Sequence, residues 1–522
     1  MATPTTPEEW FPILTARLDA AQPTISLLRS YSNGNAPLPE MGKNTAATWL
    51  AFQRKSRTNY GGIACQSHAN RIRMRGVRVG SDDKSPASEA LRRIARDNRL
   101  PMVIGDAVRN MLSARRGYLV AGVDGDGKAL LTSEMPEQFY AEPDPVRPWR
   151  ARAAVKVYRD TIAEVDYGLA WANGQRQWFT RPSRTVNGSQ TTIPLAASGS
   201  DWTAGPIESY VGSMPVWIFD RADGMGLIEP HLDVIDRINL GKLQRLCITA
   251  MQAFRQRALK KEMDAELPEK DEAGNPIDWK KVFEPAPGAL WDLPEGIDIW
   301  ESQPSDIRPL LDAEKADARD FAGVSGTPVS MLQPDSANQS ATGAAATTAQ
   351  QVDACQSDID RIRLAVAACL VTALEIERVP FGGETIEADF ENPAWVTLAE
   401  KMDAYSKAIA AGMSIGMAQK TYLGWSQEQI DEDERNRNRA AATAAMTAFA
   451  GQPKGAQPVS DAVAQSEDVK AKADAMGVLI RAGVEPDAAA MQVGLNGVKF
   501  RAGVMPASLV ARDTANAGPP VG

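Results

Sequence analysis

The chain has 522 residues, of which 43% are hydrophobic and 24% are charged, and its 57 Lys and Arg against 66 Asp and Glu give a formal net charge of -9 at pH 7. This composition is that of a soluble globular protein, and it excludes wholesale disorder, a collagen-like repeat and a disulfide-rich scaffold. At roughly 150 residues per domain, the length predicts about three or four structural units.

The sequence gives little indication of a metal site, a redox-active cysteine pair or a membrane span. No run approaches the roughly 20 apolar residues that cross a bilayer, and the first residues lack the basic start and apolar run of an export signal. The four cysteines are widely and irregularly spaced without a CxxC pair, which is typical of a reducing compartment. Two histidines, His68 and His231, leave little material for a zinc site. We therefore expect no metal, no cofactor and no membrane span.

The N-terminal region, up to about Pro182, mixes helix and strand signals. In the segment RIRMRGVRVG the apolar positions change phase at Gly76, which predicts a strand with a bulge or kink. The letters DGDG at 124–127 fit a tight hairpin turn, whereas a calcium loop would need a carboxylate where Met135 stands. Helical spacing of apolar residues predicts helices from Trp10 to before Pro23 and over residues 45–69, 88–98 and 103–113.

Residues 155–219 are strand-like and rich in aromatic side chains. Spaced tryptophans can stack on nucleic-acid bases, but in an antiparallel sheet they are more often packing residues, and we expect packing here. The residues concerned are Trp171, Trp178, Phe179, Trp202, Trp217 and Phe219.

A long helix is predicted from Gly226 to about Lys261, because its apolar residues approximate one face. From Leu240 onward this segment contains six basic residues and no acid. Clusters of Lys and Arg neutralise phosphates and attract nucleic acid without sequence preference, although a solvated or subunit-contacting face is the alternative. The candidate DNA-contacting residues are Lys242, Arg245, Arg255 and Arg257.

An insert and a second helix follow the basic segment. Residues 264–303 are rich in Pro, Gly and charge, with short apolar runs, which predicts a small β-containing lobe or hairpin between two helices. The second helix is expected after Ser305 as its N-cap, with Pro309 in the first turn and an end at Gly326 and Pro328.

The next 20 or so residues, from Met331, have almost no large apolar side chain after Leu332 and predict a mobile loop. A long helix follows, with apolar residues spaced alternately three and four from Val352 to Ile376. Cys355 and Cys369 share this seam about 21 Å apart along the axis, too far for a disulfide, so we expect them to be packing residues. The polar residues of the loop include Gln333, Asp335, Ser336, Asn338, Gln339 and Ser340.

The last part of the chain alternates short strand, helix and linker signals. The stretch ETIEADFENP predicts a half-exposed strand that ends at Pro393. Helices are predicted over residues 398–411 and 417–423 and from about 426, followed by a linker up to about Gln465. The repeats RAGVEP and RAGVMP predict a small helical module, and TANAGPPVG a disordered tail.

Catalytic motifs are weak. None of the GK pairs is followed by the hydroxyl residue of a phosphate-binding loop. GMSIG at 412–416 matches the letters of a nucleophile elbow around Ser414, but the preceding residues predict a helix rather than a strand, and both histidines lie upstream. We therefore expect a chance match in a loop between helices, and no enzyme activity.

The order and spacing of these segments resemble the portal proteins of tailed bacteriophages, particularly those of long-tailed phages of Gram-positive hosts. MPVWIFDRADGMGLIEPHLDVIDRINLGKLQRL is similar to that family's entry strand, glycine turn and first stem helix. WDLPEGIDIWESQPSDIRPLLDAEKADARDFAGVSGTP resembles the exit from the clip and the second stem helix. AEKMDAYSKAIAAGMSIGMAQKTYLGWSQEQIDEDE resembles the crown. The resemblance spans most of residues 1–450 and is strongest from Met214 to Glu434.

The resemblance implies an α+β, helix-rich fold with a portal-like architecture of wing, helical stem, small α/β clip and helical crown. The implied parts are a wing (1–225), a first stem helix (226–263), a clip insert (264–303), a second stem helix (304–327), a tunnel loop (328–345), a long wing helix and strand (346–395), a crown (396–450), a linker (451–465), a C-terminal helical module (466–510) and a disordered tail (511–522).

The resemblance also implies a function. Portal proteins form a ring, usually of twelve copies, at one vertex of the capsid, assembled in the host bacterial cytoplasm. Double-stranded DNA passes through without sequence specificity during packaging and ejection, and loop residues from Gln333 to Gly343 would project into the channel. The implied partners are the major capsid protein, the terminase large subunit, head-to-tail adaptor proteins and any scaffold protein. The alternative is a multidomain structural scaffold of a virion without a DNA channel, which a mass measurement in solution would distinguish.

Overall fold

The computed structural model describes residues 4–39, 47–80, 85–183, 196–210, 213–253, 257–261, 297–301, 306–333, 341–394, 398–425 and 427–450, together with short pieces at 270, 274, 276–277, 472, 476, 485 and 490–494. The chain divides into two compact units, one made of residues 1–413 with 422–424 and the other of residues 414–421 with 425–522. The predicted linker, C-terminal module and tail lie outside the described residues, apart from these short pieces.

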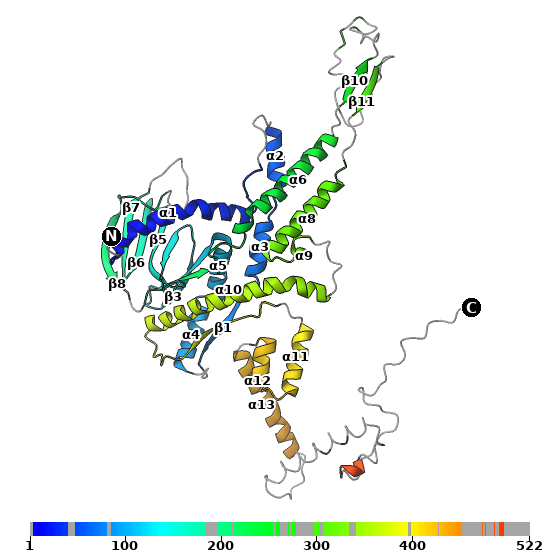
Figure 1. The fold of residues 1–522 in the computed structure, drawn as a ribbon. Helices are drawn as coiled ribbons and strands as arrows, with labels where there is room; N and C mark the ends of the chain where they lie inside the picture. Colours follow the sequence, from blue (N-terminus) through cyan, green and yellow to red (C-terminus); the bar gives the residue numbers. More distant parts are fainter. Residues whose placement is uncertain are drawn as a thin grey trace, which may run out of the picture. The chain divides into compact units, whose positions relative to one another are not determined.

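The described elements mix helices and short strands, which confirms the predicted α+β, helix-rich class (Figure 1). The helices are α1 (Pro7–Ser32), α2 (Ala47–Ser56), α3 (Tyr60–Ala69), α4 (Pro86–Asp97), α5 (Leu100–Ala114), η1 (Glu229–His231), α6 (Leu232–Ala253), α8 (Arg308–Ser325), α9 (Val329–Leu332), α10 (Ala341–Ile376), α11 (Leu398–Ala410), α12 (Ile415–Ala418), the π-helical η3 (Gln419–Leu423) and α13 (Gln427–Ala450). The strands are β1 (Met74–Val79), β2 (Arg116–Val123), β3 (Ala129–Glu134), β4 (Phe139–Pro143), β5 (Ala151–Asp160), β6 (Val165–Ala172), β7 (Gln175–Pro182), β8 (Thr203–Ser209), β9 (Val216–Asp220), β10 (Arg257–Lys261), β11 (Ile297–Glu301) and β12 (Ile386–Phe390). No described helix is long and apolar enough to cross a membrane.

The largest sheet has five antiparallel strands in the order β4-β5-β6-β7-β8, and α1 packs across one face of it (Figure 1). The rings of Phe11 in α1 and Phe179 in β7 stack with centroids 3.8 Å apart. Trp171 and Trp217 are at least 90% buried, so the predicted role of these aromatic residues in packing is confirmed.

A buried ion network joins three strands of this sheet. The Asp166 carboxylate in β6 accepts hydrogen bonds from Arg159 Nε at 2.7 Å and Arg181 Nε at 3.0 Å, and it is fully buried. Burial alone would raise the pKa of Asp166, but hydrogen bonds from Arg159, Ser183 and Arg181 hold this pKa below its usual value. The carboxylate therefore stays charged and pairs with both arginines, which fixes the register of β5, β6 and β7.

The main core lies between α5, α10 and the three-stranded sheet β3-β2-β9. As predicted, α10 buries its seam, and Cys355 and Cys369 are fully buried free thiols. The strand β12 pairs with β1 and buries Ile386, Ala388 and Phe390, and the pairing shifts register between Met74 and Gly76, where a bulge was predicted.

The start of α10 differs from the prediction. Residues 328–345 were expected to form a loop, but α9 takes up Val329–Leu332 and α10 begins at Ala341. The first turns of α10 contain four alanines between 341 and 346, and alanine has the highest helix propensity of all residues. Low apolar content therefore does not prevent a helix where propensity is high and a buried seam follows.

The long helix predicted to reach Lys261 also ends early. α6 ends at Ala253, and residues Arg257–Lys261 form β10, paired antiparallel with β11. The register places Arg257 opposite Glu301 and Lys260 opposite Asp298. Of the two strands, β11 lies within residues 264–303, where strand was predicted, whereas β10 lies before them; most of the insert lies outside the described residues.

The second helix of the pair, α8, starts two residues later than expected. Ser305 lies outside the described residues, α8 begins at Arg308, and the Asp306 carboxylate accepts a hydrogen bond from the Arg308 amide at 2.9 Å. The predicted stop is confirmed, because Gly326 adopts a left-handed φ of 65° and its amide donates to the Ala322 carbonyl.

In the last third of the chain, α11 and α13 lie where helices were predicted. Ser414 precedes α12 and follows α11, with no strand before it, so the strand-to-helix turn of a nucleophile elbow is absent at this described position. Within the second unit, Gln419 Nε2 donates to the Asp433 carboxylate at 2.6 Å, which ties the turn after α12 to α13.

The tight contact between β2 and α5 gives a stability prediction. A Cβ at Gly117 would lie 1.9 Å from the Ala107 carbonyl oxygen, whereas a Cβ at Gly122, on the same strand, would meet nothing closer than 3.9 Å. We expect Gly117→Ala to lower the free energy of unfolding by about 3 kcal/mol or more, because the backbone of β2 or α5 must move to admit the methyl group. Gly122→Ala should leave the free energy of unfolding unchanged or raise it by up to about 1 kcal/mol. Chemical denaturation measures both, and equal effects would contradict this account of the contact.

Candidate functional site

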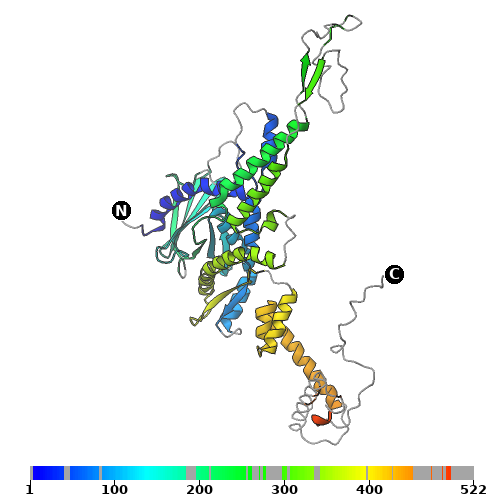
Figure 2. The ribbon, with the colours of Figure 1, turned by 45° about the vertical axis from the view of Figure 1, so that its right-hand side comes forward.

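The two helices that flank the insert form a hairpin that projects from the rest of the first unit and carries the β10–β11 pair beyond its end (Figures 1 and 2). Ion pairs hold the two helices together. Arg245 Nε in α6 lies 2.6 Å from Glu314 Oε1 in α8, and Arg237 lies 2.9 Å from Asp317 and 3.1 Å from Asp320.

Lys242 is also engaged within the chain. It is half-buried on α6, and its Nζ lies 5.4 Å from the centre of the Tyr60 ring. Burial lowers the pKa of Lys242, and the nearby Glu314 carboxylate opposes this shift. The Lys242 ammonium group, half-buried over an aromatic ring, therefore contributes to packing as well as carrying a charge.

The other residues that were predicted from the sequence to lie at a channel do not come together in the structure. Arg257 lies on β10 rather than on the helix, so it does not share a face with Lys242 and Arg245. Gln333 ends α9, and its Nε2 donates to the Lys315 carbonyl at 3.1 Å. Arg255 and the loop residues Asp335, Ser336, Asn338, Gln339 and Ser340 lie outside the described residues. A role for any of them at a channel stays a prediction.

A second basic surface, which the sequence reasoning missed, runs along α8. Arg308, Lys315 and Arg319 are exposed and recur at intervals of seven and four residues, so they share one face of the helix. The described part of the chain contains no ion pair to any of the three. We call these three residues the α8 basic stripe. The helical spacing of these basic residues is a signal that the sequence itself contains.

Buried contacts fix the base of the hairpin. The rings of Tyr60 in α3 and Phe321 in α8 stack with centroids 6.3 Å apart. Next to the end of α8, His68 is fully buried and its Nδ1 lies 3.0 Å from the Ala64 carbonyl, and burial lowers its pKa to about 4. Gln351 in α10 donates to Ser67 Oγ at 2.9 Å. A neutral His68 therefore belongs to the joint between α3, α8 and α10.

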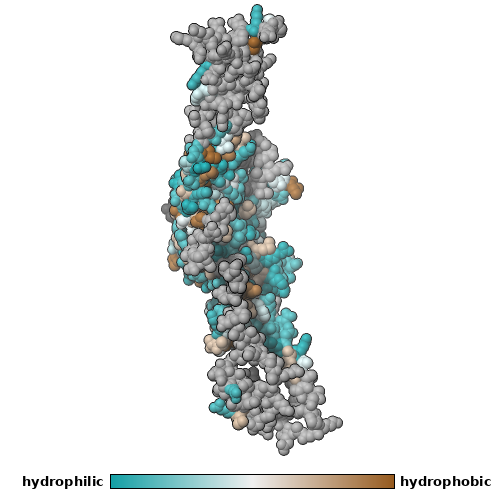
Figure 3. Space-filling model, turned by 90° about the vertical axis from the view of Figure 1, so that its right-hand side faces the viewer, coloured by the Kyte–Doolittle hydropathy of each residue, from teal (hydrophilic) through white to brown (hydrophobic). Residues whose placement is uncertain are grey.

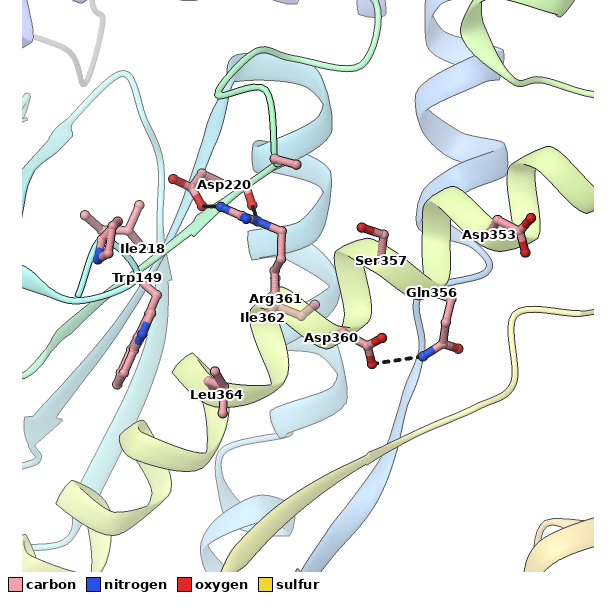
Figure 4. Close-up of a pocket in the computed structure, with 12 residues that line it drawn as sticks. Trp149, Ile218, Asp220, Asp353, Gln356, Ser357, Asp360, Arg361, Ile362 and Leu364 are labelled. Atoms are coloured by element: carbon pink, nitrogen blue, oxygen red, sulfur yellow. Dashed lines mark hydrogen bonds and ion pairs between the residues drawn. The ribbon is translucent and has the colours of Figure 1, made fainter. Parts of the chain in front are cut away.

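A pocket of about 690 Å³ lies beside α10 (Figure 4). Apolar walls come from Trp149, Ile218 and Leu364, and Arg361 crosses the pocket to reach the Asp220 carboxylate at 3.0 Å. Gln356 donates to Asp360 at 3.0 Å. Several of the pocket's polar groups therefore already pair with one another. Among all the described residues, no group of three or more His, Cys, Asp or Glu side chains could hold a metal ion.

Next to this pocket lies a buried carboxyl, Asp358, whose side chain is 7% exposed. Burial raises the pKa of Asp358 to about 6, although Arg221, with its Nε 3.7 Å away, opposes the shift. Arg221 also faces Asp223 at 3.4 Å. The arginine is therefore shared, and it does not keep Asp358 ionised at mildly acidic pH.

Comparison with known proteins identifies a family. A family model described as "Phage portal protein, SPP1 Gp6-like" matches residues 28–438, from within α1 into α13. Among solved structures, a chain from "Neck of empty GTA particle computed with C6 symmetry" matches with 13% identity and a TM-score of 0.38, covering 74% of this chain and 95% of that chain. No curated protein matches the chain.

The buried carboxyl predicts a pH dependence of stability. Because the pKa of Asp358 is about 6 in the folded state, above the roughly 3.9 of an unfolded Asp, the folded state binds more protons between these values. The free energy of unfolding should therefore fall as pH rises from about 4 to 6, by about 2 to 3 kcal/mol from this group. Asp358→Asn should remove that component in denaturation experiments at several pH values. Asp353→Asn, exposed on the same helix, should keep the wild-type dependence, and parallel curves for all three proteins would refute the assignment.

Proposed function

Because the chain belongs to the SPP1 Gp6-like family of phage portal proteins, we propose that it is the conduit through which double-stranded DNA enters and leaves a phage capsid. A portal protein is a structural component of the virion. It forms a ring with copies of itself at a capsid vertex and connects the head to the tail side.

The observation that carries the proposal is the projecting hairpin of α6 and α8. Its two helices are held by ion pairs, but large apolar side chains remain on its outside, with Leu240 of α6 40% exposed and Val324 of α8 51% exposed. Identical copies arranged side by side would cover these side chains through heterologous contacts, and such contacts generate a closed ring when the rotation between copies closes. Twelve copies is the number that we propose.

The parts of the ring and their partners follow from this arrangement. The five-stranded sheet with α1, together with α10, would form the wing that contacts the major capsid protein and any scaffold protein. The β10–β11 pair beyond the hairpin would form the clip, where the terminase large subunit docks during packaging and head-to-tail adaptor proteins dock afterwards. The residues from α11 to α13 would form the crown. Assembly would take place in the host bacterial cytoplasm.

DNA would contact the channel weakly. The chain carries a net charge of -9, so a ring of copies repels DNA at long range, and short-range attraction is confined to local basic groups. Contacts to phosphates are independent of sequence, which suits a duplex that must slide. Catalysis is not part of this role, and the force for packaging would come from the terminase.

Ring formation is directly measurable. We expect the purified full chain to sediment or scatter as a single large species with a mass of about twelve chains, and negative-stain images to show a central opening wide enough for a double helix. A monomer or dimer, or a compact particle without an opening, would contradict the conduit and would favour a structural scaffold without a DNA channel.

We also propose that the polar residues between α9 and α10, including Asp335, Ser336, Asn338, Gln339 and Ser340, narrow the channel. Deleting residues 335–339 should leave ring mass unchanged, because neither flanking helix is shortened. It should reduce the amount of DNA retained in packaging assays. Replacing the same residues by a Gly-Ser segment of equal length is the control for loop length. Wild-type packaging by the deletion variant would count against the loop.

A further inference from the structure

We propose that the α8 basic stripe, Arg308, Lys315 and Arg319, is the surface of the hairpin that contacts DNA phosphates in the channel, in place of the basic residues of α6. This inference rests on the proposed function as a DNA conduit. It assigns a specific face of the hairpin to the DNA.

The geometry of α8 makes the stripe continuous. At about 100° per residue, the three side chains fall within about 40° of one another around the helix, and they span about 16 Å along its axis. All three are exposed, and the residues that the structure describes offer them no ion-pair partner. A DNA phosphate that binds the stripe would therefore not have to displace a described ion pair within the chain.

The acids on the opposite face of α8 are already paired. Glu314, Asp317 and Asp320 pair with arginines of α6. Two acids lie beside the stripe: Asp312, about 40° from Arg308 around the helix, and Asp306, whose carboxylate accepts a hydrogen bond from the Arg308 amide. The stripe thus keeps an excess of positive charge in a chain whose overall charge is negative.

The position of Arg308 argues against a purely structural role. It is the first residue of α8, and the first turn of this helix contains no acid. The helix dipole disfavours a positive charge at an N-terminus by about 0.3 to 1 kcal/mol. The Asp306 carboxylate accepts a hydrogen bond from the Arg308 amide and offsets part of this cost, but the described residues offer the Arg308 side chain no ion pair, which leaves it available to an external anionic partner.

The shape of the first unit indicates which side of the hairpin faces the ring axis. The sheet β4–β8 with α1 lies on the α6 side of the hairpin, and α2 packs against α6, whereas α8 lies on the opposite side (Figures 1 and 2). In a closed ring the room available to each copy increases with radius, so the bulky side belongs outside and the slender side inside. On the side that carries α8, the residues that Figure 3 colours are largely hydrophilic, with scattered hydrophobic ones. A channel wall for a hydrated polyanion is expected to have this character.

The test compares three variants of the full chain. Arg308→Gln, Lys315→Gln and Arg319→Gln together remove the stripe. Arg308→Lys with Arg319→Lys keeps its charge. The matched control replaces the same number of exposed basic residues in the wing, Arg109→Gln, Lys128→Gln and Arg147→Gln. Ring mass is measured first for every protein, and binding of a short DNA duplex to the rings is then measured over a range of salt concentrations.

We expect all variants to form rings. Removing the stripe should weaken duplex binding by about tenfold or more and make its salt dependence shallower, since fewer counterions are released. The control and the Lys variant should stay within about twofold of wild type. Equal loss in the control, no loss in the stripe variant, or no duplex binding by wild-type rings would overturn the inference while leaving ring formation intact. Failure of the stripe variant alone to form rings would overturn it too, because the stripe would then be a contact between copies. Failure of the wild-type chain to form rings would refute the proposed function itself.

Discussion

The pairing between α6 and α8 decides how charge is distributed over the hairpin. Arg237 and Arg245 of α6 meet the acids Glu314, Asp317 and Asp320 of α8, so the basic residues of the first helix neutralise the acidic side of the second. The Arg245–Glu314 pair is the one strengthened by low exposure to water, which for Glu314 is 14% of the side chain. What remains uncompensated on α8 is its basic stripe. The same contacts that close the hairpin therefore leave a positive surface on the opposite face.

The rest of the first unit supplies a packed base for this hairpin. The base of the hairpin is connected to the main core by the stacking of Tyr60 on Phe321, by the buried His68 and by the packed seam of α10. The five-stranded sheet is held in register separately, through Asp166 and its two arginines. The hairpin needs such a base, because two helices alone bury too little apolar surface to be stable.

Features with a strong local signal were predicted from the sequence, and features decided by pairing at a distance were not. The seam of α10, the bulge at Gly76 and the stop at Gly326 follow from periodicity, a change of phase and a left-handed backbone position. The end of α6 was missed because β10 depends on β11, which lies 36 residues away in the sequence from Lys261 to Ile297. For the candidate site, a count of basic residues located the hairpin, but composition cannot show that Arg245 pairs with Glu314 inside the chain.

The central claim is that copies of this hairpin surround a channel with α8 on its inner wall. An electron cryo-microscopy map of the purified assembly, at a resolution that separates helices, tests it most directly. The account predicts a closed ring in which α8 borders the opening and the sheet with α1 lies at the periphery. A ring whose opening is lined by α6 or by the wing sheet, or an assembly without an opening, would contradict it.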